Sequence, residues 1–169
     1  HVPETSFMLY FDNVRIAPDA LVGEEGQGLK HLFAGLNPER ICAAAINNGI
    51  ARYAIEKGAA QAGERKVWGP AIGAHQVVAH PLAAAYVGVQ QARLMTARAA
   101  QLYDEGSPEA GAVANMAKFA AADSSLVALD QAIQVHGGNG MALEYGLADL
   151  WFIARLHKTA PVSREMILN

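Results

Sequence analysis

The sequence has only one cysteine and no long apolar run, and each shortage excludes a class of protein. Cys42 cannot form an internal disulfide, so nothing requires an oxidising compartment and we expect a cytoplasmic protein. No apolar run approaches the ~20 residues of a membrane-spanning helix. Residues 1–6 also lack the basic region and apolar core of a signal peptide. We therefore expect a soluble protein with no membrane partner.

Charge is scarce as well. Charged residues make up 17% of the chain, against roughly 25% in an average soluble protein. Thirteen lysines and arginines stand against 16 acidic residues, so the basic excess that binds nucleic acid is missing. Hydrophobic residues reach 52%, which indicates that part of the surface is covered by a partner. The 169 residues suffice for one domain with a sizeable core.

A metal site is not expected either. The histidines show neither the His-Glu-x-x-His spacing of zinc enzymes nor the Glu-x-x-His spacing of di-iron bundles. No nucleophile motif surrounds the thiol or any serine.

Residues 7–16 form the one segment that resembles a strand. They are rich in aromatic and branched types, and Pro18 and Asp19 follow at once. A lone strand leaves its backbone groups unpaired, so we expect it to dock on a sheet that the rest of the chain does not contain. This indicates a further domain upstream.

Helical signals begin at Gly26. A short helix over residues 27–36 is expected to lead to Asn37-Pro38-Glu39, which has the cap, the proline and the acidic residue typical of a new helix start. The new helix should run to about Gly63.

Two further long helices and two short ones complete the pattern. The second long helix is traced by an apolar stripe of Val78, Leu82, Ala85, Val89, Ala92, Met95, Ala99 and Leu102. The third opens at Ser107-Pro108-Glu109, ends at Gly137, and carries a stripe of Met116, Phe119, Ala122, Leu126, Leu129 and Ile133. Short helices are expected over residues 147–157 and after Val162. The sequence therefore predicts an all-α fold, a four-helix up-and-down bundle preceded by a remnant β strand.

Three segments carry candidate chemistry, and each also has a purely structural interpretation. In Gln134-Val-His-Gly-Gly-Asn-Gly140, the glycines either stop a helix or let a phosphate or sugar approach the bare backbone. No strand precedes it, so it is not a dinucleotide fingerprint. Glu64-Arg-Lys-Val-Trp-Gly69 is either a solvated helix end or an anion clamp. Glu39 is either a helix-dipole partner or, in an apolar surround, a general base.

Five motifs occur in the order found in acyl-CoA dehydrogenases, and nearly the whole chain resembles that family. They are Gly23-Glu-Glu-Gly-Gln-Gly28, Leu36-Asn-Pro-Glu-Arg40, Glu64-Arg-Lys-Val-Trp-Gly69, Gln134-Val-His-Gly-Gly-Asn-Gly140 and Glu144-Tyr145. The resemblance implies that residues 1–25 are the end of a middle β domain with its linker. Residues 26–169 would then be the C-terminal helical bundle domain.

The resemblance also implies a reaction. In that family a carboxylate removes the α-proton of an acyl-CoA thioester while hydride leaves the β-carbon for FAD, and the product is an enoyl-CoA. Most members place the base in the final loop, where this chain has Pro161. Isovaleryl-CoA dehydrogenases place it at the start of the first long helix, where this chain has Glu39. We therefore expect Glu39 to be the base and Arg40 to help bind substrate.

The remaining site residues follow from the same resemblance. It implies FAD contacts by Arg65, Gln76, Gln134, Gly137, Gly138 and Ser163, with Glu165 as a further candidate. The expected assembly is a homodimer or homotetramer, and the expected electron acceptor is an electron-transfer flavoprotein.

Several positions depart from the family pattern. Trp151-Phe-Ile-Ala154 replaces Trp-Arg-Asp-Ala, and Met141, Ala142 and Gly146 replace other common residues. Two alternatives therefore stay open. One is a flavoprotein oxidase or monooxygenase on the same fold, which would pass flavin electrons to O2. The other is a non-catalytic helical assembly module, which would purify without flavin colour.

Overall fold

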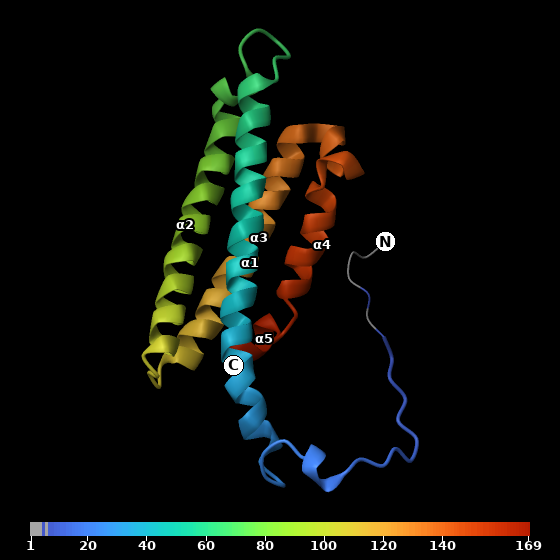
Figure 1. The fold of residues 1–169 in the computed structure, drawn as a ribbon. Coiled ribbons are helices and arrows are strands. Elements are labelled where there is room, and N and C mark those ends of the chain that lie inside the picture. Colours follow the sequence, from blue (N-terminus) through green and yellow to red (C-terminus); the bar gives the residue numbers. More distant parts are fainter. Residues whose placement is uncertain (1–4, 6) are drawn as a thin grey trace.

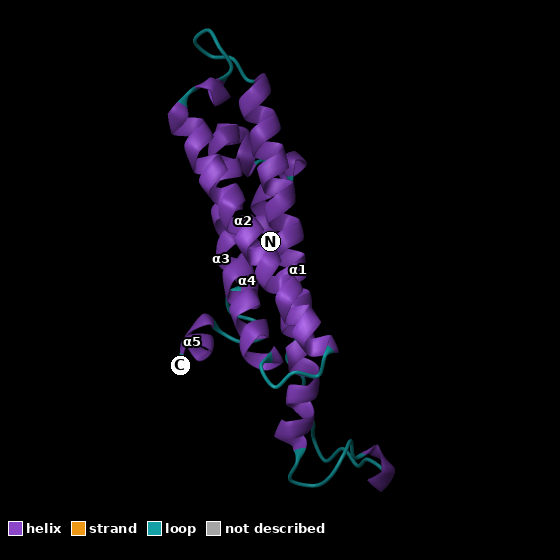
Figure 2. Cartoon of the chain, turned by 90° about the vertical axis from the view of Figure 1, so that its left-hand side faces the viewer, coloured by secondary structure: helices purple, strands orange, loops and turns teal. Residues whose placement is uncertain are grey.

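The fold is a bundle of antiparallel helices, shown in Figure 1 and, from the side, in Figure 2. A computed structural model describes residue 5 and residues 7–169. The helices run up and down the bundle in the order α1 (Gly28–Glu64), α2 (Gln76–Asp104), α3 (Ala110–His136) and α4 (Leu147–His157), and α5 (Arg164–Leu168) follows. Short 3-10 turns occupy Pro18–Ala20, Ile72–Ala74, Gly137–Met141 and Leu143–Tyr145. The predicted four-helix bundle is confirmed.

The first helix is longer than the sequence predicts. A break was expected at Asn37-Pro38, but α1 continues through Pro38, so that expectation is wrong. A proline inside a helix removes one backbone donor and crowds the carbonyl four residues earlier. Residues 27–35 are exposed, so water can solvate the freed carbonyl of Ala34. The helix therefore tolerates the proline in its first turns.

The predicted strand over residues 7–16 does not form. All of these residues are described, and they have no ladder partner. Phe7 is 81% exposed and Tyr10 is 85% exposed. A strand needs a neighbour for its backbone groups, and no sheet exists in the described part of the chain. The strand expectation is therefore wrong for the chain by itself, for the reason that the sequence already indicated.

Alanine dominates the core and sets how closely the helices approach. Ala44, Ala54, Ala114 and Ala121 are completely buried. A Cβ atom added at Gly58 of α1 would lie 3.3 Å from the Cα of Ala132 in α3, so these backbones nearly touch. The interior is therefore filled by small side chains at close helix spacing, with few large ones.

The central helix, α3, packs against α1, α2 and α4. Its predicted apolar stripe is only partly correct: Leu129 is completely buried, whereas Met116 is 52% exposed. The buried positions instead include many alanines together with Lys118 and Ser125. On α2 the predicted stripe agrees better, because Leu82, Ala85, Val89, Ala92, Ala99 and Leu102 are buried.

The predicted helix ends are mostly confirmed. The last residue of α3 is His136, and Gly137 follows with φ of +61°, a conformation that favours glycine. Helix α4 has the predicted bounds. Ser163 caps α5, because its Oγ accepts a hydrogen bond from the backbone N–H of Met166.

Candidate functional site

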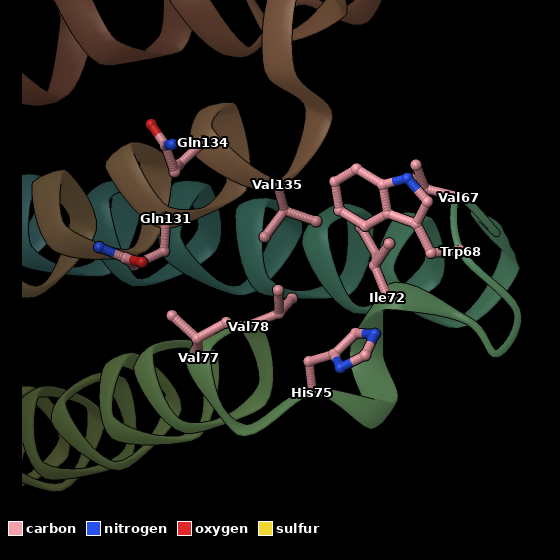
Figure 3. Close-up of a pocket in the computed structure, with 9 residues that line it drawn as sticks. All are labelled: Val67, Trp68, Ile72, His75, Val77, Val78, Gln131, Gln134 and Val135. Carbon is pink, nitrogen blue, oxygen red and sulfur yellow. The ribbon is translucent and has the colours of Figure 1, made fainter.

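An apolar pocket of about 550 Å³ lies where the α1–α2 turn meets the end of α3 (Figure 3). Trp68 stands at one end of it, and Gln131 and Gln134 of α3 form one side. The other lining residues are Val67, Ile72, His75, Val77, Val78 and Val135. Trp68 is 88% exposed, so a large aromatic surface is presented without cover from the described residues. The pocket combines an apolar floor with a few polar groups, as ligand sites do.

The turn that forms this pocket is held by backbone contacts. Arg65 caps the end of α1, and its carbonyl accepts a hydrogen bond from the N–H of Ile72 at 2.8 Å. Lys66 and Ala71 form an antiparallel bridge inside the turn. The side chains of Arg65, just before this turn, and Gln76, just after it, are exposed. Both predicted cofactor contacts therefore stand at the same end of the bundle as the pocket.

The glycine loop after α3 lies at that end too. A Cβ atom added at Gly137 or Gly138 would meet open space, so the backbone of both is bare to an approaching group. Gly140 is different, because a Cβ there would lie 2.6 Å from the carbonyl oxygen of Ile133. Close packing therefore requires glycine at position 140, which the sequence had not singled out.

Neighbouring side chains brace this loop. Buried His136 places its Nδ1 2.7 Å from the carbonyl oxygen of Ala132, and its ring meets the edge of Tyr145 at a centroid distance of 5.4 Å. Asn139 donates a hydrogen bond to the Tyr145 hydroxyl at 3.2 Å. The loop is thus tied to α3 while Gly137 and Gly138 stay exposed.

Glu39 and Arg40 lie on α1, farther toward the opposite end of the bundle. Glu39 is exposed, so the described residues do not provide the apolar surround expected of a general base. Arg40 is only 5% exposed; its Nη1 donates to Asn37 Oδ1 at 3.0 Å, and its guanidinium lies 5.9 Å from the centre of the Phe33 ring. Burial lowers the pKa of Arg40, which the Glu39 carboxylate partly opposes. Among the described residues, nothing accepts a hydrogen bond from Arg40 Nε.

Lys118 is a buried cation that the sequence analysis missed. It is 1% exposed, and its Nζ donates a hydrogen bond at 2.5 Å to the carbonyl oxygen of Val162, next to Ser163. Burial, and after it the positive charge of Arg40, lower the pKa of Lys118 to about 8 against the opposing charges of Asp123 and Glu165. A lysine amid the apolar stretch of α3 was the only sequence signal for it.

Asp123 forms a second tie between α3 and the end of the chain. Its carboxylate binds Lys158 at 2.7 Å through one oxygen and Arg164 at 2.6 Å through the other. The Arg164 guanidinium also lies 4.5 Å from the centre of the Phe119 ring. The segment that carries Ser163 is therefore held to α3 on both sides.

The predicted site residues thus fall into two groups. Arg65, Gln76, Gln134, Gly137 and Gly138 gather around the α1–α2 turn. The second group, toward the other end, contains Glu39, Arg40 and Ser163, and Lys118 of α3 donates a hydrogen bond to the carbonyl of Val162 beside Ser163.

The described residues provide neither a metal site nor a membrane-spanning helix. Within residue 5 and residues 7–169, no group of three or more histidine, cysteine, aspartate and glutamate side chains is placed to hold a metal ion. No helix in that part of the chain is long and apolar enough to cross a membrane.

The chain is thus an up-and-down helical bundle domain with a glycine loop braced at one end. Its similarity to known proteins shows the family to which this domain belongs. The family described as "Acyl-CoA dehydrogenase, C-terminal domain" matches residues 26–166. The chain is 52% identical over 168 residues to acyl-CoA dehydrogenase fadE12 of Mycobacterium bovis, covering 99% of this chain and 43% of that protein. The chain therefore belongs to the acyl-CoA dehydrogenase family, whose members are oxidoreductases.

Solved structures agree on the fold. Butyryl-CoA dehydrogenase from Megasphaera elsdenii superposes with a TM-score of 0.89 at 28% identity, over 94% of this chain and 41% of that one. The FAD complex of PigA gives a TM-score of 0.89 at 25% identity, again over 94% and 41%. The chain spans about two fifths of the length of these relatives.

Proposed function

We propose that this chain is the helical part of an FAD-dependent acyl-CoA dehydrogenase that oxidises an acyl-CoA thioester to the 2,3-enoyl-CoA. In this proposal residues 1–25 end a middle β domain and residues 26–169 form the C-terminal bundle. The exposed apolar segment over residues 7–16 supports that division, because its side chains need a sheet to cover them. The proposal includes a cytoplasmic location and a homodimer or homotetramer.

The single observation that carries the proposal is the arrangement around the α1–α2 turn. An apolar pocket, the amide of Gln134 and the bare backbone of Gly137 and Gly138 occur at one end of the bundle, where Arg65 adds a positive charge. A dinucleotide such as FAD needs an apolar surface, close backbone approach and a cation for its phosphates. The residues present fit that group.

FAD, when bound, would supply the acceptor for the hydride that leaves the β-carbon of the substrate. The chain's own contribution is removal of the substrate's α-proton: the Cα–H bond breaks and the proton passes to the carboxylate of Glu39, which we assign as the base. Buried Arg40 beside it would hold the substrate and stabilise the ionised carboxylate. The apolar surround that raises the basicity of Glu39 must then come from the upstream domain or from a partner subunit.

A direct test uses FAD binding by the polypeptide in which this chain follows its β domain. Arg65→Gln removes one charged contact to the pyrophosphate and should weaken FAD binding about tenfold or more. Arg98→Gln is the matched control, because Arg98 is an exposed arginine on α2 that donates a hydrogen bond to Gln101, outside the predicted site. Equal FAD affinity in the two variants, measured by flavin absorbance titration, would contradict the assigned flavin site.

A second candidate is an oxidase or monooxygenase on the same fold. It is supported by Pro161, which leaves the final loop without a carboxylate at the position most family members use. Reduced flavin that reacts with O2 faster than with an electron-transfer flavoprotein would favour this candidate. Reduced flavin that reacts faster with an electron-transfer flavoprotein than with O2 would support the dehydrogenase.

A further inference from the structure

Lys118 is too costly a residue to bury without a compensating role. A lone ammonium group taken out of water is strongly disfavoured, and it is tolerated only when it is paired and hydrogen-bonded. Lys118 is 1% exposed, and the charges that act on its ammonium group include the negative charge of Asp123, on the same helix, and the positive charge of Arg40, on α1. An apolar side chain at this position would fill the same space, so packing alone does not call for lysine.

Lys118 donates a hydrogen bond to the backbone of the segment that follows α4. Its acceptor is the carbonyl oxygen of Val162, 44 residues away in sequence and directly before Ser163. Asp123, one and a half turns farther along α3, holds the same segment through Lys158 and Arg164. Ser163 thus lies between Val162, which Lys118 of α3 binds, and Arg164, which Asp123 of α3 binds.

We propose that Lys118 is a positioning residue of the flavin site, which fixes Ser163 against α3 by holding the Val162 carbonyl. The inference rests on the proposed function, in which Ser163 contacts the flavin. Lys118 itself touches neither substrate nor flavin in this proposal.

The first measurement follows local opening of the 169-residue chain by hydrogen exchange and mass spectrometry. In Lys118→Met, which keeps the length of the side chain and removes its charge and donor, amides of residues 159–168 should exchange about tenfold faster. Amides of α1 and α2 should be unchanged. Lys57→Met is the control, because Lys57 is an exposed lysine that stacks on Tyr53. Exchange that stays unchanged, or that rises equally in every helix, would overturn the proposal.

Should Lys118→Met fail to fold, Lys118→Arg serves as the second variant. It retains a cation and a donor but moves them, so the same residues 159–168 should exchange faster by a smaller factor. An Arg variant with unchanged exchange in that segment would count against the proposal.

The second measurement uses the polypeptide that includes the β domain. Lys118→Met should weaken FAD binding about tenfold, while Lys57→Met should bind FAD as the unmodified protein does. If the unmodified protein binds no FAD, the proposed function fails while the anchoring seen by exchange still stands. If the unmodified protein and Lys118→Met bind FAD equally, the positioning role fails and the proposed function survives.

Discussion

The stability of the bundle should depend on alkaline pH through Lys118. The pKa of this lysine is about 8 in the folded chain against 10.5 in an unfolded one, because burial and the charge of Arg40 oppose protonation. Between these values the unfolded chain binds more protons than the folded chain does. The free energy of unfolding must therefore rise with pH across this window, and below pH 8 the full burial penalty applies.

The size of this effect can be bounded. The lowering of the Lys118 pKa corresponds to a change of at most about 3 kcal/mol in the free energy of unfolding. Screening by solvent reduces the expected change to roughly 1–2 kcal/mol. The assay is urea unfolding, followed by helical circular dichroism, of the unmodified chain and of Lys118→Met at pH values from 7.5 to 10. Other titrating groups contribute equally to both proteins, so the difference between them isolates Lys118. The free energy of unfolding of the unmodified chain, minus that of Lys118→Met, should rise as the pH increases. If this quantity stays constant or falls, the reasoning is refuted.

Packing predicts two further contrasts in stability. Gly140→Ala should lower the free energy of unfolding by about 2 kcal/mol, because its Cβ would lie 2.6 Å from the Ile133 carbonyl oxygen, whereas Gly138→Ala, which meets open space, should change it by less than about 0.5 kcal/mol. Leu129→Ala should cost about 3 kcal/mol as a fully buried leucine, whereas Met116→Ala, at a half-exposed position, should cost less than about 1 kcal/mol. Thermal and urea unfolding of the four variants check both contrasts, and equal losses within either pair would contradict the packing described.

Apart from the break expected at Asn37-Pro38, the order of the helices and most helix ends were predictable from local signals. Gly137 takes positive φ and ends α3 where the sequence placed that end, and α4 begins at the predicted Leu147, directly after Gly146, which also takes positive φ. Such positions carry their own conformational preference, so no tertiary information is needed. The helix break predicted at Pro38 was wrong because a helix can continue through a proline where the surrounding turns are exposed to water. The sequence alone does not show that exposure.

The buried face of α3 was harder to predict because alanine occurs on several of its sides. Alanine is compatible with both core and surface, so a periodic pattern built from it does not select one face. The burial of Lys118 depends on Val162, far along the chain, and sequence rules treat lysine as exposed. Only the family resemblance grouped Gln134 and Arg65 as residues predicted to bind flavin, since they come from different helices.

The central claim is that Glu39 removes the α-proton of an acyl-CoA thioester while FAD accepts the β-hydride and is reduced. Anaerobic titration of the FAD-loaded polypeptide with acyl-CoA thioesters, followed by bleaching of flavin absorbance, tests it most directly. We predict bleaching in the unmodified protein and in Glu56→Gln, an exposed control on α1, and none in Glu39→Gln. Bleaching by Glu39→Gln at the unmodified rate would contradict the account.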